Sequence, residues 1–228
     1  VTYVPAMLKV VDEVISNSCD EFRRKDNMGL DTLEVYINKE KGEITVKDNG
    51  GIPIVKHKDA GIYIPEFIFG RLRTSSNYND DEDRNVIGTN GVGSALANVF
   101  SKKFIIESAD NKNKFHRTWK DNMRTVCDDL IIEKCSDHFT STKLWLDFKR
   151  FDTKAKTFTP EFVDIIEKRC IDAAAANLGL KVNFEYKDKV ESLIDEVPSL
   201  LGRNFRYILD LTPEQQADVI SRTFHEAI

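Results

Sequence analysis

A glycine-rich segment at residues 88–93 is the part of the sequence best suited to hold a phosphate. Gly88, Gly91 and Gly93 fall within six positions, and glycine lets the backbone turn sharply and approach a ligand closely. An apolar pattern with helical spacing follows, formed by Val92, Leu96, Val99 and Phe100. A helix that begins here would point its free N–H groups and the positive end of its dipole at an anion. The segment therefore makes a nucleotide the leading ligand hypothesis.

Two familiar phosphate-binding motifs do not describe this segment. A Walker A loop needs a lysine before its hydroxyl residue, and Gly93 precedes Ser94 instead. A dinucleotide-binding fingerprint should follow a strand, whereas a polar stretch precedes these glycines. Because a lone glycine pattern also occurs by chance, the segment needs support from other parts of the chain.

Three polar residues share one stripe of a predicted N-terminal helix. Glu13, Asn17 and Asp20 stand at positions i, i+4 and i+7, nearly opposite the apolar face. One interpretation is a solvated surface. The other is the polar wall of a pocket, in which a carboxylate deprotonates water and an amide oxygen binds Mg²⁺.

A second motif, residues 48–53, ends a predicted hairpin. It is either a simple turn or a buried carboxylate, Asp48, that accepts a hydrogen bond from the exocyclic amine of a base. Thr142 would be a second partner for that base. The run 74–77 is either ordinary loop composition or a set of hydroxyls and an amide that meets ribose and phosphate oxygens.

The elements that must position these residues follow from periodicity. A 3.6-residue apolar period predicts a helix over 4–24, and alternation predicts a hairpin over 33–38 and 43–48. Further predicted helices are 64–70, the segment after Gly93, and one from Pro160 to about Asn177 with Thr159 as N-cap. Further predicted strands are 103–108, 114–119, 130–134, 143–148 and 180–186, and residues 49–62 and 73–90 read as loops. This order predicts an α/β sandwich with a mixed sheet and helices on one face.

Bulk composition fits a folded domain. The 228 residues are 41% hydrophobic and carry a net charge of −5, which does not favour this piece as a main DNA-gripping surface. Four scattered cysteines form no metal-ligating cluster and suit idle thiols in a reducing compartment. No long apolar run or leader is visible, and the start at Val1 suggests a fragment. We expect one domain over 1–186 and a tail over 187–228 with helices near 190–202 and 213–227.

The order of these motifs resembles the GHKL ATPases. This superfamily has the Bergerat fold, a two-layer sandwich with a mixed, mostly antiparallel sheet, and includes gyrase and other type II DNA topoisomerases, MutL-type repair proteins, large chaperones and sensor histidine kinases. The resemblance narrows to the ATPase region of eukaryotic-type and large-phage type II topoisomerases over residues 3 to about 186. It rests on the segments 3–13, 74–82 and 98–101.

The resemblance implies a role for each position. It makes Glu13 the general base, Asn17 the Mg²⁺ ligand, Asp20 a polar neighbour of the nucleotide, and Asp48 the adenine reader, assisted by Thr142. The remaining nucleotide-binding positions are Gly50, Ile52, Ser75, Ser76, Asn77, Gly88, Asn90, Gly91, Val92, Gly93 and Ser94. It also implies ATP and Mg²⁺ as ligands, DNA as the substrate of the full enzyme, closure of a homodimer, a separate cleavage subunit in some relatives, and an intracellular location.

The chain departs from the family pattern in several places. The Asp48 motif has no residue between Gly50 and Gly51, where relatives have one, and Ala95 stands where some relatives have lysine. No Gln-x-Lys sequence occurs, so the transducer lysine is absent, as is the cleavage-tyrosine domain. Two alternatives stay open, namely a MutL-like or chaperone-like ATPase, and a nucleotide-binding module without hydrolysis.

Overall fold

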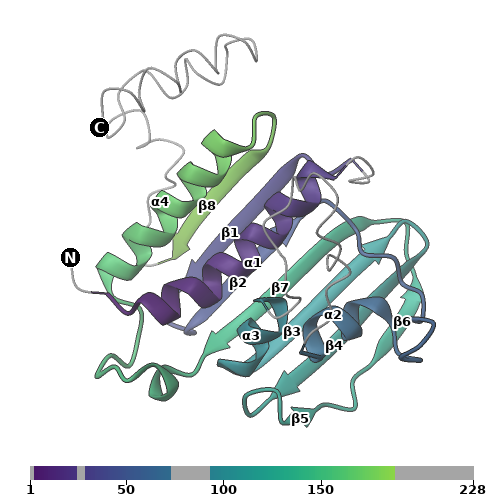
Figure 1. Cartoon of the computed structure of the whole chain (residues 1–228), viewed down its shortest axis with the longest axis horizontal. Coiled ribbons are helices and arrows are strands. Elements are labelled where there is room, and N and C mark those ends of the chain that lie inside the picture. The colour runs from purple at the N-terminus through teal and green to yellow at the C-terminus, as the bar shows by residue number, and fades with distance from the viewer. Residues whose placement is uncertain (1–2, 25–28, 73–92, 188–228) are drawn as a thin grey trace, which may run out of the picture.

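A single twisted sheet with helices on one face forms the described part of the chain (Figure 1), which the computed structural model covers at residues 3–24, 29–72 and 93–187. The helices in these ranges are α1 (Pro5–Arg23), α2 (Ile64–Gly70), α3 (Gly93–Val99), the 3₁₀ helix η1 (Phe148–Phe151) and α4 (Pro160–Ala176). The strands are β1 (Thr32–Asn38), β2 (Glu43–Asp48), β3 (Ser101–Asp110), β4 (Asn113–Lys120), β5 (Thr125–Val126), β6 (Ile131–Lys134), β7 (His138–Leu146) and β8 (Lys181–Lys187).

The strand order places sequence-distant segments side by side. It runs β5-β4-β3-β7-β2-β1-β8, with β6 also paired to β4. The β1–β8 pair is parallel and the other named pairs are antiparallel, so the sheet is mixed and mostly antiparallel as predicted. Because β7 lies between β2 and β3, Asp48 at the end of β2 pairs with Thr140, which is 92 positions later in the chain. This crossing positions the site described below.

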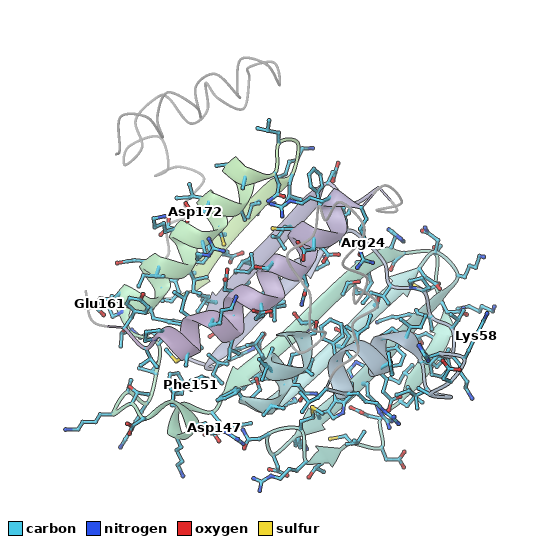
Figure 2. All side chains as sticks on the ribbon, in the orientation of Figure 1. Arg24, Lys58, Asp147, Phe151, Glu161 and Asp172 are labelled. Carbon is cyan, nitrogen blue, oxygen red and sulfur yellow. The ribbon has the colours of Figure 1, made fainter. Side chains whose placement is uncertain are left out.

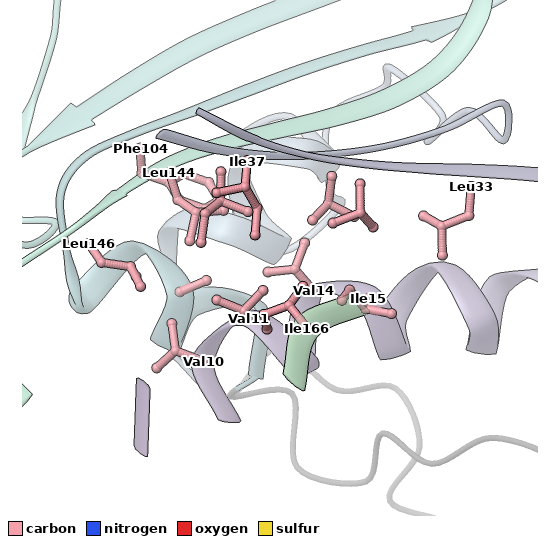
Figure 3. Packing of buried hydrophobic residues seen from close by; sticks show 14 of the residues in the cluster. Val10, Val11, Val14, Ile15, Leu33, Ile37, Phe104, Leu144, Leu146 and Ile166 are labelled. Carbon is pink, nitrogen blue, oxygen red and sulfur yellow. The ribbon is translucent and has the colours of Figure 1, made fainter. Parts of the chain in front are cut away.

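Helix α1 is the central element of the helical layer. Pro5 begins it, where a missing N–H costs nothing, and its apolar side packs onto the sheet. Figure 3 shows Val11, Val14 and Ile15 of this helix turned toward strand residues that include Leu33 and Leu144. The buried strand residues alternate with exposed ones, so one face of the sheet carries the core and the other faces solvent.

Helix α4 packs beside α1 in the helical layer and lies next to the edge strand β8 (Figure 1). Thr159 caps it by accepting a hydrogen bond from the Phe162 N–H at 3.3 Å. Arg169 on α4 donates from Nε and Nη2 to Asp12 Oδ1 at 2.8 and 2.6 Å, which fixes the two helices together. Figure 2 shows Asp172, a second ionic partner of Arg169, on the same helix.

Most predicted elements are confirmed, and the differences are local. The helix, hairpin and strand boundaries agree to within a few residues, but β7 begins at His138 rather than Lys143. Apart from Phe139 its first residues are polar, and Thr140 and Ser141 are both buried between β2 and β3, so the sequence shows no alternation of apolar and polar residues there. Neither β5 nor η1 was predicted. The loop over 73–90 and the two tail helices lie outside the described residues. No helix within the described ranges has the length and apolar character needed to cross a membrane.

Candidate nucleotide-binding site

The carboxylate of Asp48 lies buried at the end of β2, beneath α1. Ser18 on α1 donates from Oγ to Asp48 Oδ2 at 2.6 Å, and the Gly50 N–H donates to Oδ1 at 3.0 Å. Burial raises the pKa of Asp48 from its ordinary 3.8 to about 7, although the bonds from Ser18, Gly50 and the Thr140 backbone oppose that rise. A carboxylate placed in this way can still accept a hydrogen bond from a ligand, because each oxygen has a further lone pair.

Thr142 faces the same side of the sheet as Asp48 and is buried. In the β2–β7 register it stands opposite Val46, and Thr140 stands opposite Asp48. The Thr142 hydroxyl donates to the Val46 carbonyl at 3.2 Å. Thr140 is therefore the direct cross-strand neighbour of Asp48, and Thr142 lies two residues further along β7.

The chain after Asp48 forms a tight, buried turn. Gly50 is buried against Leu30, and Ile52 donates its N–H to Ser108 Oγ at 3.1 Å on β3. The turn is therefore fixed to the neighbouring strands rather than free in solvent.

The other half of the site joins α1 to the start of α3. Asn17 donates from Nδ2 to Ser94 Oγ at 2.9 Å. Glu13 lies one turn earlier on α1, and its carboxylate is so close to Gly93 that a Cβ added at that glycine would overlap Glu13 Oε2. Glycine at position 93 thus allows a close approach between this carboxylate and the beginning of α3.

Glu13 has a cationic partner that the sequence reasoning did not single out. Lys9 Nζ lies 2.7 Å from Glu13 Oε1. The hydrogen bond to Glu13 raises the pKa of the Lys9 ammonium, so Lys9 is charged at neutral pH. The signal for this pair was the i, i+4 spacing of opposite charges on a helix.

Asp20 is the third member of the polar stripe, and it is buried rather than solvated. Its carboxylate lies 3.7 Å from Arg23 Nη1, a partner on the same helix. A fully solvated surface therefore does not describe the stripe, because Asp20 is buried and Asn17 and Glu13 contact the start of α3. The pocket-wall interpretation stays a prediction.

Adjacent residues of α1 connect the two halves. Asn17 bonds Ser94 and Ser18 bonds Asp48, so the end of the early strand and the start of the later helix contact the same turn of one helix. Of the other predicted site residues, Ser75, Ser76, Asn77, Gly88, Asn90, Gly91 and Val92 lie outside the described residues. Ser18 was not among the predicted site residues, although a serine on the buried side of a helix was an available signal.

Oxygen chemistry at this site suits a hard cation. The bond to Ser94 uses the amide nitrogen of Asn17 and leaves its amide oxygen as a ligand of the kind that Mg²⁺ prefers. No group of three or more His, Cys, Asp or Glu side chains within 3–24, 29–72 and 93–187 is arranged to hold a metal by itself. Such a site would need additional oxygens from a bound ligand, which the phosphates of a nucleotide supply.

A hollow of about 680 Å³ lies on the open face of the sheet and reaches the end of β2, where Asp48, Asn49 and His138 help to line it. Outward-facing charged side chains, among them Glu107 and Lys143, line the rest. Glu107 lies within 3.4–3.7 Å of Lys114, His116 and Lys143, so its carboxylate has partners on both neighbouring strands. We assign no ligand to this hollow.

Comparison with known proteins gives consistent relatives. The chain is 40% identical over 185 residues to a DNA topoisomerase 2 of Caenorhabditis elegans, covering 80% of this chain and 12% of that protein. It is 37% identical over 232 residues to human DNA topoisomerase 2-beta, covering 99% of this chain and 13% of that protein. The chain thus spans about an eighth of the length of these curated relatives. No protein-family model matches it.

Solved structures agree with the sequence relatives. The ATPase region of Saccharomyces cerevisiae topoisomerase II superposes with a TM-score of 0.74 at 34% identity, covering 83% of this chain and 50% of that one. The ATPase and transducer domains of a topoisomerase II from Balamuthia mandrillaris give 0.73 at 33% identity, with 86% and 51% covered. The sheet with its helical layer is therefore the GHKL fold that the sequence predicted.

Proposed function

Because the chain is homologous to the ATPase region of type II DNA topoisomerases, we propose that it binds ATP between the Asp48 turn and the start of α3 and hydrolyses it. The observation that carries this proposal is the pair of bonds from α1, Asn17 to Ser94 and Ser18 to Asp48, because they connect the end of β2 and the start of α3 to adjacent residues of one helix. The similar solved structures are ATPase regions of topoisomerase II, which supports a nucleotide as the ligand.

Asp48 is proposed to read the base. An ionised, buried carboxylate accepts a hydrogen bond from the exocyclic amine of adenine, and guanine presents a carbonyl oxygen at the equivalent position. Two carbonyl or carboxylate oxygens facing each other leave buried acceptors unpaired, which is costly. We therefore expect a preference for ATP over GTP. Thr142, Gly50 and Ile52 complete the base-side positions.

Glu13 is proposed to accept the proton of the attacking water. The water oxygen forms a bond to the γ-phosphorus, the bond from that phosphorus to the bridging oxygen breaks, and ADP leaves with the electron pair. Glu13 takes the water proton as the new bond forms, which yields phosphate. Its closeness to Gly93 supports this role, since the glycine-rich segment 88–93 ends at that residue.

Asn17 would hold Mg²⁺ through its amide oxygen, together with phosphate oxygens of the nucleotide. When bound, the ion would neutralise negative charge on the phosphates. Ser94 keeps the Asn17 amide oriented by accepting from its nitrogen. The residues Ser75, Ser76, Asn77, Gly88, Asn90, Gly91 and Val92 are proposed to contact ribose and phosphate.

We also propose the setting of the whole protein. ATP would close two such domains into a gate, and hydrolysis would reopen it, coupled to passage of one DNA duplex through another inside the cell. The active site for DNA cleavage would lie outside this chain, either elsewhere in the same polypeptide or on a separate subunit. The 228-residue chain alone is expected to hydrolyse ATP slowly, because it contains no Gln-x-Lys sequence.

Calorimetry with ATP and GTP, each with and without Mg²⁺, tests the ligand class, the base preference and the metal together. We expect ATP to bind more tightly than GTP and Mg²⁺ to strengthen both. Equal affinity for the two nucleotides would remove Asp48 as the base reader, and no binding of either would end the proposal. Assays of the full-length protein distinguish this function from a MutL-like or chaperone-like role. A topoisomerase should show DNA-stimulated ATPase activity and relax supercoiled DNA.

A further inference from the structure

The backbone of the turn that follows Asp48 is held by side chains from three strands. Each N–H between residues 50 and 54 donates to a side-chain acceptor, apart from Pro53, which has no N–H. The pairs are Gly50 with Asp48 on β2, Gly51 with His138 on β7, Ile52 with Ser108 on β3, and Ile54 with Asp110 on β3. Side-chain acceptors thus replace the strand ladder that ends at Asp48, and they fix the path of the turn.

His138 is the member of this set that contacts the turn at two points. Its Nε2 lies 3.2 Å from the Gly51 nitrogen and its Nδ1 lies 2.9 Å from the Asn49 carbonyl oxygen. An N–H can only donate, so Nε2 must accept and carry no proton. A carbonyl can only accept, so Nδ1 must carry the proton. The geometry therefore specifies one neutral tautomer, with both ring nitrogens used by the same turn.

The turn is also too tight to move toward or away from this ring freely. A Cβ at Gly51 would lie 2.7 Å from His138 Nε2 and would overlap the Ala109 carbonyl oxygen. The backbone therefore packs directly against the imidazole. Asn49 completes the anchoring on the other side, because its Oδ1 accepts from the Asp31 and Thr32 N–H groups at 2.9 Å.

We propose that His138 is a positioning residue for nucleotide binding. It holds the Asn49–Gly51 peptides in place, and the Gly50 N–H within that segment in turn orients the Asp48 carboxylate. The inference rests on the proposed role of Asp48 as the base reader. It adds a residue from a distant strand that is not itself expected to touch the ligand.

The test compares ATP with inorganic tripolyphosphate, which contains the phosphates but no base. His138→Ala should weaken ATP binding about fivefold, the effect of losing hydrogen bonds of ordinary strength, and leave tripolyphosphate binding unchanged. His138→Gln supplies an amide that can accept from Gly51, so it should restore most of the ATP affinity. His116→Ala, on β4 and away from the turn, is the matched control and should bind both ligands as the parent does.

Several outcomes separate this inference from the proposed function. If the parent chain binds no ATP, the function itself fails and the inference fails with it. If the parent binds ATP and His138→Ala binds it equally well, only the role of His138 is overturned. The same holds if both ligands weaken equally in a variant whose melting temperature is unchanged.

A measurement on the parent chain covers the case in which the variants do not fold. Nitrogen-15 NMR of the histidine side chains should show His138 with its proton on Nδ1 and none on Nε2 at pH 8. A proton on Nε2, or exchange between both tautomers, would mean that the Gly51 bond is not formed, and the inference would be withdrawn.

Discussion

The two ends of the proposed ATP site are built in different ways. The base end is buried: Asp48 is 8% exposed, and the turn behind it is fixed by side chains from β3 and β7. The phosphate end depends on contacts between two helices, where Lys9 and Glu13 are 62% and 25% exposed in their side chains. We therefore expect base selectivity to depend on the buried end and hydrolysis to depend on the more exposed end.

The largest expected effect is at the phosphate end. Glu13→Gln should lower the rate of ATP hydrolysis by roughly 100-fold or more, the usual contribution of a general base, because the amide cannot accept the water proton. ATP affinity should change little, since the glutamine has the same shape. Single-turnover release of phosphate measures the rate, and Asp164→Asn, an exposed acid on α4, is the control. An unchanged rate in Glu13→Gln would remove Glu13 as the base.

The next largest effect is expected on ATP affinity, when Asp48 at the base end is replaced. Asp48→Ala removes a charged hydrogen-bond acceptor, which is worth about 1.5–3 kcal/mol, so ATP affinity should fall roughly 10- to 100-fold. Tripolyphosphate affinity should stay near that of the parent. Calorimetry measures both, and an ATP affinity equal to that of the parent would place the base elsewhere.

A smaller effect is a pH dependence with a defined sign. Burial raises the pKa of Asp48 to about 7, so the ionised form that accepts from adenine increases between about pH 6 and 8. ATP affinity of the parent should therefore rise more steeply with pH than that of Asp48→Asn. The variant provides the control because ATP itself titrates identically in both experiments. Parallel pH profiles would contradict the assignment.

The same group affects folding in the opposite direction. Between about pH 4 and 7 the folded chain keeps a proton on Asp48 that the unfolded chain has lost, so this residue makes stability fall as pH rises through that window. Asp48→Asn should become more stable relative to the parent as pH increases from 4 to 7. Thermal unfolding at several pH values measures this difference, and a constant offset would show that Asp48 is not buried as described.

The smallest expected effect comes from removing the Lys9 side chain at the phosphate end. Lys9→Met removes an exposed partner of Glu13, and exposed ion pairs contribute less than about 1 kcal/mol, so the melting temperature should hardly change. Turnover should fall only a few-fold, since Glu13 remains in place. A loss as large as that of Glu13→Gln would mean that Lys9 takes part in the chemistry directly.

Local pattern was enough to predict most of the fold. The apolar period of α1 and the alternation in β1 and β2 follow from the packing of one face, and each was predicted with boundaries within two residues of those observed. The start of β7 was missed because its buried Thr140 and Ser141 are polar and lie between two strands. The first residues of β7 form a strand because they pair with β2 and β3, and no local sequence pattern indicates that pairing.

The site was partly predictable for the same reason. Glu13 and Asn17 lie four residues apart on one helix, so their proximity follows from helical spacing. The glycine-rich segment marked the start of α3 as their expected neighbour, and both residues contact it. His138 had no such signal, because its partners Asn49 and Gly51 are 89 and 87 positions away in the sequence. Only the insertion of β7 between β2 and β3 brings it to the turn.

The most direct measurement is a crystal structure of the 228-residue chain with a non-hydrolysable ATP analogue and Mg²⁺. We predict the exocyclic amine of the adenine within hydrogen-bonding distance of the Asp48 carboxylate, and the triphosphate at the start of α3 beside Glu13 and Asn17. A nucleotide bound on the open face of the sheet, or one whose base and phosphates do not reach these two ends together, would contradict the account.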